Sequence, residues 1–115
     1  MNKKKPLVYL AVPYTHKDKA VMEYRFIQAN KTAGMIMRKS EIVYSPISHC
    51  HPIHLMCEMP GDWEFWKRID KTYIELSHKM YILKLDGWEE SPGVQAEIEM
   101  AKELNLKIVF LEEIK

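Results

Sequence analysis

Apolar residues along the chain alternate between short unbroken runs and longer stretches with a three- to four-residue repeat. The runs predict buried strands, because four to eight consecutive aliphatic, β-branched and aromatic residues are typical of a parallel sheet. The predicted strands are Leu7–Val12, Glu41–Ser45, Met80–Asp86 and Lys107–Leu111. Pro13 and Pro46 follow the first two, and proline ends a central strand because it has no N–H to donate.

The periodic stretches between these runs predict amphipathic helices. The first covers about Lys17–Lys39 and the second Asp62–His78. The third begins at Ser91-Pro92, where a serine N-cap precedes a proline suited to the first helical position. Residues 47–61 are rich in histidine and proline and are predicted to form an irregular loop. A loop of this length in a small domain is usually functional or disordered.

The predicted order, β-α-β-α-β-α-β, favours one α/β domain over residues 1–115. We expect three α/β/α layers around a four- to five-stranded parallel sheet of the Rossmann or flavodoxin type. Ligands of such sheets bind beyond the carboxyl ends of the strands, where the strand order reverses. The segments expected at that edge are Pro13-Tyr14-Thr15, Ser45-Pro46-Ile47, Asp86-Gly87-Trp88 and Ser91-Pro92-Gly93.

Charge and composition narrow the class of partner. Seventeen Lys and Arg against sixteen Asp and Glu give a net charge of +1, whereas proteins that bind nucleic acid polymers through phosphates usually carry a larger basic surplus. No apolar run approaches the ~20 residues of a membrane span, and Leu7–Val12 is too short for a secretory signal. Cys50 and Cys57 are expected to be free thiols in a cytoplasmic protein. We therefore expect a small-molecule ligand.

The predicted ligand edge carries groups that suit an anion or a sugar. No glycine-rich dinucleotide or P-loop motif is present. Ser91 and Gly93 open a helix whose free N–H groups attract anions, although ordinary helix capping explains the same residues. Tyr14 either offers its hydroxyl to a ligand or covers the end of the sheet. From these residues alone both alternatives stay open.

Two acidic residues suggest glycosidic chemistry. Glu97 lies one turn beyond Gly93 and is either drawn toward the ligand edge or exposed on the helix. Asp70 is unfavourable in the middle of a helix unless it has a partner, which is either a neighbouring Lys67 or Arg68 or a ligand. Two carboxylates that flank an anomeric carbon can cleave a glycosidic bond.

These residues fall in motifs that resemble the nucleoside 2-deoxyribosyltransferase superfamily, which includes the 2′-deoxynucleoside 5′-phosphate N-hydrolases. The chain looks most similar to a short bacterial and phage branch. The matching pieces cover nearly the whole chain: Val8–Tyr14, Asp70 followed by His78, and the segment Ser91–Glu97, which is similar to the family's Ser-x-Gly-x-x-x-Glu signature. Val12 departs from the pattern, because members commonly have glycine there. His78 stands where an acidic residue is usual.

The resemblance implies a role for each matching residue. Glu97 corresponds to the nucleophile, Asp70 to the carboxyl group that assists departure of the base, and Tyr14 to the hydroxyl that orients the nucleophile. Ser91 corresponds to the position that holds a 5′-phosphate. Arg25 is a phosphate or sugar candidate and equally a solvated helix arginine. The remaining expected substrate contacts are Gly93, Pro13, His49 and Trp88, of which Trp88 is the expected stacking partner of the base, while Trp66 is expected in the core.

The expected function is cleavage of the N-glycosidic bond of a nucleoside or (deoxy)nucleoside 5′-monophosphate with retention of configuration. Hydrolysis is favoured over base exchange. One of the two carboxyl groups is expected to stay charged while the other has a raised pKa. The resemblance also implies a homodimer, and no cofactor is expected. A non-catalytic nucleotide-binding module is the first alternative, supported by Val12. The second is metal binding through residues 49–57, although this stretch lacks the paired spacing of a zinc site. His49 or His51 in a substrate-covering loop is a further alternative.

Overall fold

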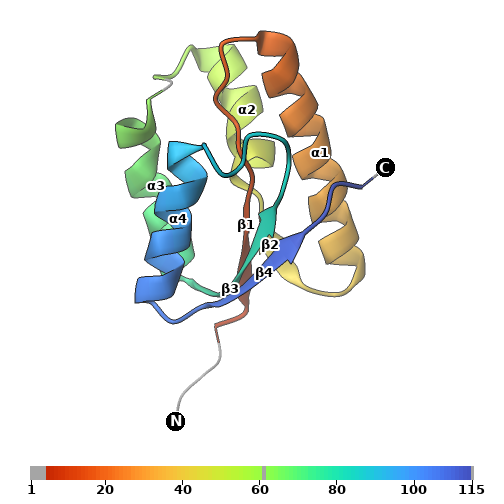
Figure 1. The fold of residues 1–115 in the computed structure, drawn as a ribbon, viewed down its shortest axis with the longest axis vertical. Helices are drawn as coiled ribbons and strands as arrows, with labels where there is room; N and C mark the ends of the chain where they lie inside the picture. Colours follow the sequence, from red (N-terminus) through yellow and green to blue (C-terminus); the bar gives the residue numbers. More distant parts are fainter. Residues whose placement is uncertain (1–4, 61, 115) are drawn as a thin grey trace.

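A computed structural model describes residues 5–60 and 62–114 of the chain. Its strands and helices alternate along the chain as the sequence predicts, with one additional helix (Figure 1). In chain order the elements are β1 (Leu7–Ala11), α1 (Lys19–Arg38), β2 (Ile42–Tyr44), α2 (Pro46–Cys57), α3 (Trp63–Glu75), β3 (Ser77–Leu83), α4 (Pro92–Glu103) and β4 (Lys107–Leu111).

The strands form one parallel sheet of four strands in the order β2-β1-β3-β4. The order reverses between β1 and β3, because the chain moves from β1 to one side for β2 and to the other for β3. Helices α1 and α2 cover one face of the sheet, and α3 and α4 cover the other (Figure 1). The predicted three-layer α/β/α fold is therefore confirmed.

The central strand β1 is buried on both faces. Val8 and Leu10 pack with α1, whereas Tyr9 and Ala11 pack with α3 and α4, and none of the four side chains is exposed. Such two-sided burial is why the strand appears in the sequence as a continuous apolar run rather than an alternating one. It also means that any polar atom on β1 is held in the interior, away from water.

The predicted loop at residues 47–61 is wrong for most of its length, because residues Pro46–Cys57 form α2. Ser45 and Pro46 stand at the start of this helix as Ser91 and Pro92 do in α4, although the Ser45 side chain makes no capping hydrogen bond. Pro52 lies inside α2. A proline there removes the backbone donor that would bond the carbonyl four residues earlier, yet the helix continues to Cys57. The prediction failed because it took a stretch rich in His and Pro as irregular.

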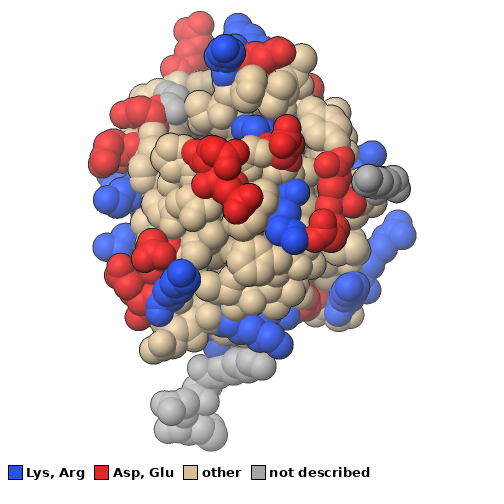
Figure 2. Space-filling model, in the orientation of Figure 1, with Lys and Arg blue, Asp and Glu red and all other residues tan. Residues whose placement is uncertain are grey.

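The surface carries charges of both signs. On the face shown in Figure 2, acidic and basic side chains are interspersed rather than gathered on opposite sides. This distribution agrees with the net charge of +1 and gives no broad basic surface on this face. Within the described residues, no helix combines the length and apolar character that crossing a bilayer requires.

Candidate functional site

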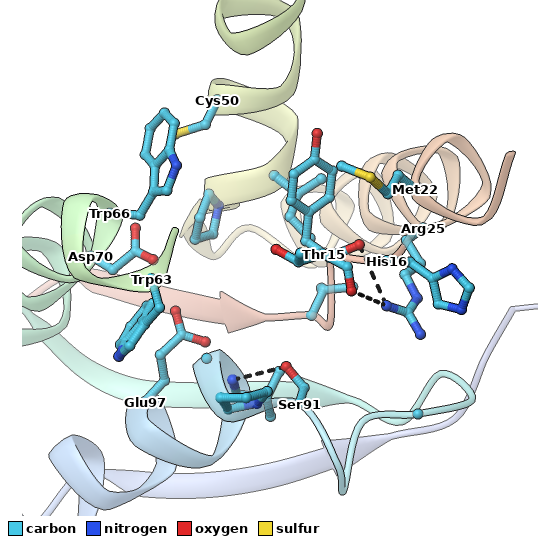
Figure 3. A pocket seen from close by; sticks show the side chains of 18 of the residues that line it. Thr15, His16, Met22, Arg25, Cys50, Trp63, Trp66, Asp70, Ser91 and Glu97 are labelled. Carbon is cyan, nitrogen blue, oxygen red and sulfur yellow. Dashed lines mark hydrogen bonds between the residues drawn. The ribbon is translucent and has the colours of Figure 1, made fainter. Parts of the chain in front are cut away.

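A cavity of about 690 Å³ opens at the carboxyl edge of the sheet, beside the reversal of strand order between β1 and β3. Its walls come from the loops that follow β1 and β3 and from helices α1 to α4 (Figure 3). The predicted catalytic and substrate-binding residues found in its lining are Tyr14, Arg25, Asp70, Ser91, Gly93 and Glu97.

Two buried carboxyl groups stand at one end of this cavity. Asp70 projects from α3 and Glu97 from α4, and only 7% and 5% of these residues are exposed. Figure 3 shows both carboxyl groups on the same side of the cavity, together with Trp63 and Trp66. Among the described residues, Oδ1 of Asp70 has no hydrogen-bond partner. The fold therefore places two acids, 27 positions apart in the sequence, at one desolvated site with a free acceptor.

Burial dominates the titration of this pair. It raises the pKa of Glu97 well above the ordinary value, and the nearby charge of Asp70 raises this pKa further, against the opposing effect of the hydrogen bond from Tyr9. Burial also raises the pKa of Asp70 to about 6. The expectation that only one of the two pKa values is raised is not met, because both groups are desolvated. Two neighbouring carboxyl groups with raised pKa values can share one proton, and such a pair titrates as a unit.

Tyr9 is the site residue that the sequence analysis missed. Its hydroxyl donates to Oε2 of Glu97 at 2.5 Å, and the whole side chain is buried. Burial raises the pKa of Tyr9 well above its ordinary value, so the phenol stays a neutral donor. The available signal was the residue type: a phenol in a strand buried on both faces needs a polar partner. The resemblance instead assigned contact with the nucleophile to Tyr14.

Tyr14 contacts a different group. Its hydroxyl lies 2.5 Å from Nδ1 of His51 on α2, and Nε2 of the same imidazole lies 3.2 Å from Oε1 of Glu23 on α1. Tyr14 and His51 both line the cavity. The site thus holds two polar groups: the acids with Tyr9, and a second hydrogen-bonded chain that comes from the other face of the sheet.

Arg25 is buried rather than solvated, with 8% of the residue exposed. Its guanidinium donates to the backbone carbonyl oxygens of Tyr14 and Thr15 after β1 and of Asp86 after β3, at 3.4, 3.3 and 2.9 Å. Burial lowers the pKa of Arg25. These bonds tie together the two loops on either side of the strand-order reversal and so fix the shape of the cavity.

Ser91 and Gly93 form the N-terminal end of α4 at the cavity wall. Oγ of Ser91 accepts from the backbone N–H of Val94 at 3.2 Å, as an N-cap does. A side chain at Gly93 would come within 3.6 Å of the Trp63 ring, so this turn lies directly against an indole. The positive end of α4 therefore reaches the cavity.

Three expected substrate contacts lie outside the described lining of the cavity: Pro13, His49 and Trp88. Pro13 is fully buried. His49 lies on the outer side of α2, where its Nδ1 is 3.4 Å from the Tyr44 hydroxyl. The turn at residues 86–90 carries Trp88 toward β4, where its ring packs 5.6 Å from that of Phe110. Trp63 and Trp66 line the cavity instead, so Trp66 is not the core residue that the sequence predicted.

Cys50 and Cys57 are free. Within residues 5–60 and 62–114, no three His, Cys, Asp or Glu side chains are grouped so that they could hold a metal ion. Helix α2 separates the His and Cys side chains of residues 49–57. His51 and His54 line the cavity, whereas His49 and Cys57 lie outside the lining.

Replacement of Gly87 by alanine is expected to destabilise the fold by about 1–3 kcal/mol. Gly87 has a φ of 91°, and a Cβ there would lie 2.7 Å from Nη2 of Arg25, so the change disturbs both the turn and the arginine bonds. Urea unfolding measures the effect. Gly34→Ala is the matched control: no atom lies within 4 Å of its Cβ position in α1, and alanine should stabilise that helix by up to about 1 kcal/mol. Equal stability of Gly87→Ala and wild type would contradict the role of this turn.

Glu97→Gln is expected to raise stability at pH 7.5 by roughly 1–3 kcal/mol, because it removes the cost of ionising a buried carboxyl group. The pKa of Glu97 is raised in the folded state, so its favourable contribution is complete below the unfolded pKa and is lost as pH rises through the folded pKa. The gain should therefore shrink toward pH 4. Thermal melts across this range test it, with the exposed Glu103→Gln on the same helix as control. A gain that is absent at pH 7.5, or the same at both pH values, would refute the assignment.

The model of the family described as a domain of unknown function, DUF1937, matches residues 6–113. No curated protein matches the chain. The matched range runs from the start of β1 to beyond the end of β4 and includes the whole cavity lining. The chain therefore belongs to the DUF1937 family.

Proposed function

We propose that this protein cleaves the N-glycosidic bond of a (deoxy)nucleoside 5′-monophosphate or nucleoside, with Glu97 as nucleophile and retention of configuration. The observation that carries the proposal is the pair of buried carboxyl groups, Asp70 and Glu97, at one end of a single cavity, with the Tyr9 hydroxyl bonded to Glu97. The motifs similar to the nucleoside 2-deoxyribosyltransferase superfamily support the same chemistry.

In the first step a carboxylate oxygen of Glu97 attacks the anomeric carbon. The C–N bond breaks, its electron pair passes to the base nitrogen, and the shared proton moves from Asp70 to the base. The pair must hold this proton on Asp70 at the moment of attack. The donor bond from Tyr9 to Oε2 of Glu97 favours that state, because it stabilises the charged form of Glu97.

In the second step water attacks the same carbon and releases Glu97. Asp70, now a carboxylate, takes the proton of the water. Two successive displacements at one carbon retain its configuration. The two acids and the hydroxyl of Tyr9 are sufficient for both steps, so the chemistry requires no group beyond substrate and water.

A nucleoside 5′-phosphate fits the cavity because the lining offers donors for the phosphate and aromatic surfaces for the base. The N-terminal end of α4, with Ser91 and Gly93, carries a positive dipole and backbone donors. The indoles of Trp63 and Trp66, which also line the cavity, offer stacking surfaces for a base (Figure 3). We favour hydrolysis over base exchange because Ser91 suits a nucleoside monophosphate.

We also propose a cytoplasmic homodimer. Free thiols at Cys50 and Cys57 suit a reducing compartment. Leu55 and Met56 on α2 are 61% and 84% exposed, and adjacent exposed apolar residues favour a contact with another copy of the chain.

The expected result of incubation with 2′-deoxynucleosides and their 5′-monophosphates is release of free base, measured by chromatography. Glu97→Ala should abolish release, and Asp70→Asn should slow it by about 10²–10⁴-fold because it removes the proton donor. Glu103→Ala, an exposed change on the same helix, should leave the rate unchanged. Failure of the wild type to turn over any member of the panel, or undiminished turnover by Glu97→Ala, would refute the proposal.

A bell-shaped dependence of kcat/KM on pH is the second expected result. The pair is active with one proton, so activity should rise as pH passes about 6, where the pair loses its first proton, and fall at a higher pH, where the pair loses its second. In Asp70→Asn no acid remains to be lost, so the alkaline decline should disappear. A profile that is flat from pH 5 to 9 would be inconsistent with a shared proton.

A further inference from the structure

The proposed reaction does not use the hydrogen-bonded side chains of Tyr14, His51 and Glu23. They connect the β1–α1 loop to α2 and then to α1, through contacts of 2.5 and 3.2 Å. The imidazole of His51 is held firmly: only 5% of the residue is exposed, the Tyr14 ring meets it edge-on at 84°, and the Phe26 ring lies 4.3 Å away at 32°. Such a ring keeps its orientation when a ligand binds.

The partners of His51 fix its tautomer. A carboxylate accepts hydrogen bonds and donates none, so Nε2 carries the hydrogen and donates to Glu23. When the imidazole is neutral, Nδ1 is then an acceptor, and Tyr14 donates its hydroxyl hydrogen to it. Burial and the charge of Glu23 raise the pKa of Tyr14, so the phenol remains neutral. Its one hydrogen is committed to His51, and the oxygen retains only lone pairs for other contacts.

The position of Tyr14 suits contact with the base rather than the sugar. In a displacement, Glu97 attacks the face of the anomeric carbon opposite to the base, so the base extends away from Glu97 across the cavity. The Tyr14 hydroxyl lies against His51 on α2, which covers one face of the sheet, whereas Asp70 and Glu97 come from α3 and α4 on the other. Among the described residues, His51 is the hydrogen-bond partner of the Tyr14 hydroxyl, which leaves its lone pairs free.

We propose that Tyr14, held by His51 and Glu23, is a specificity-determining residue that selects a base with an amino donor over one with an oxo group at the same position. This inference rests on the proposed function, because it takes the ligand to carry a nucleobase. An oxo group against the oxygen of the half-buried Tyr14 would bring two acceptors together without a hydrogen between them. Sites that demand one hydrogen-bond polarity discriminate strongly in this way.

Calorimetric titration with two matched ligand pairs tests the proposal. The pairs are 2′-deoxycytidine and 2′-deoxyuridine 5′-monophosphate, and 2′-deoxyadenosine and 2′-deoxyinosine 5′-monophosphate, which differ by amino against oxo. The Glu97→Gln background prevents turnover during titration. We expect the amino member of at least one pair to bind about tenfold more tightly or better. Tyr14→Phe should reduce that ratio to within about threefold, whereas Tyr24→Phe, an exposed tyrosine on α1, should leave it unchanged.

Glu23→Ala tests the positioning role of the outer residue. Without the carboxylate the imidazole is free to carry its hydrogen on Nδ1, which turns the Tyr14 hydroxyl toward the cavity as a donor. Binding of the oxo members should therefore strengthen while binding of the amino members weakens. Long-range ¹H–¹⁵N correlation spectra of His51 should show the Nε2–H tautomer in the wild type and a shift toward Nδ1–H in Glu23→Ala, a change that a merely structural role would not produce.

The outcomes separate this inference from the proposed function. Equal binding of both members of each pair, a preference that survives in Tyr14→Phe, or an Nδ1–H tautomer in the wild type overturns the specificity role and leaves the glycosidic chemistry standing. Absence of binding by all four nucleotides overturns the proposed function and the inference together. Preference for the oxo members in the wild type reverses the assigned polarity and also overturns the inference.

Discussion

The burial of Glu97 beside Asp70 is the interaction on which the site depends. Water is replaced around both carboxyl groups by β1, α3 and α4, and the pKa of each rises. A lone buried carboxylate would be costly, and the pair reduces that cost by sharing a proton, with Tyr9 as a neutral donor to Glu97. The pair can therefore supply both a proton and a negative charge, and glycosidic cleavage needs both.

The central strand makes this arrangement possible. Because β1 is buried on both faces, its alternate residues serve different layers: Val8 and Leu10 hold α1, while Tyr9 points to the helices that carry the acids. Just beyond its end, Tyr14 turns toward α2. One short segment therefore supplies a tyrosine to each of the two polar groups in the cavity.

Arg25 gives the cavity its fixed outline. A buried guanidinium that donates to backbone carbonyls of two loops holds those loops at a set separation, and the left-handed Gly87 lets the second loop pass close to it. The same interactions explain why Arg25 is not available as a freely solvated surface residue. Its contribution to the site is the shape of the walls that lie next to the N-terminal end of α4.

The sequence by itself determined the sheet, three of the four helices and the serine cap of α4, because periodicity and local capping are properties of neighbouring residues. It also marked Asp70 and Glu97 as unusual. Only the tertiary structure decided that both are buried at one cavity, that Tyr9 rather than Tyr14 contacts Glu97, and that Trp63 and Trp66 rather than Trp88 line the walls. These facts depend on which side chains from distant segments meet at the edge of the sheet. They also depend on helix α2, which the His- and Pro-rich sequence did not predict. The local sequence pattern does not predict such contacts, since they form only when the layers pack.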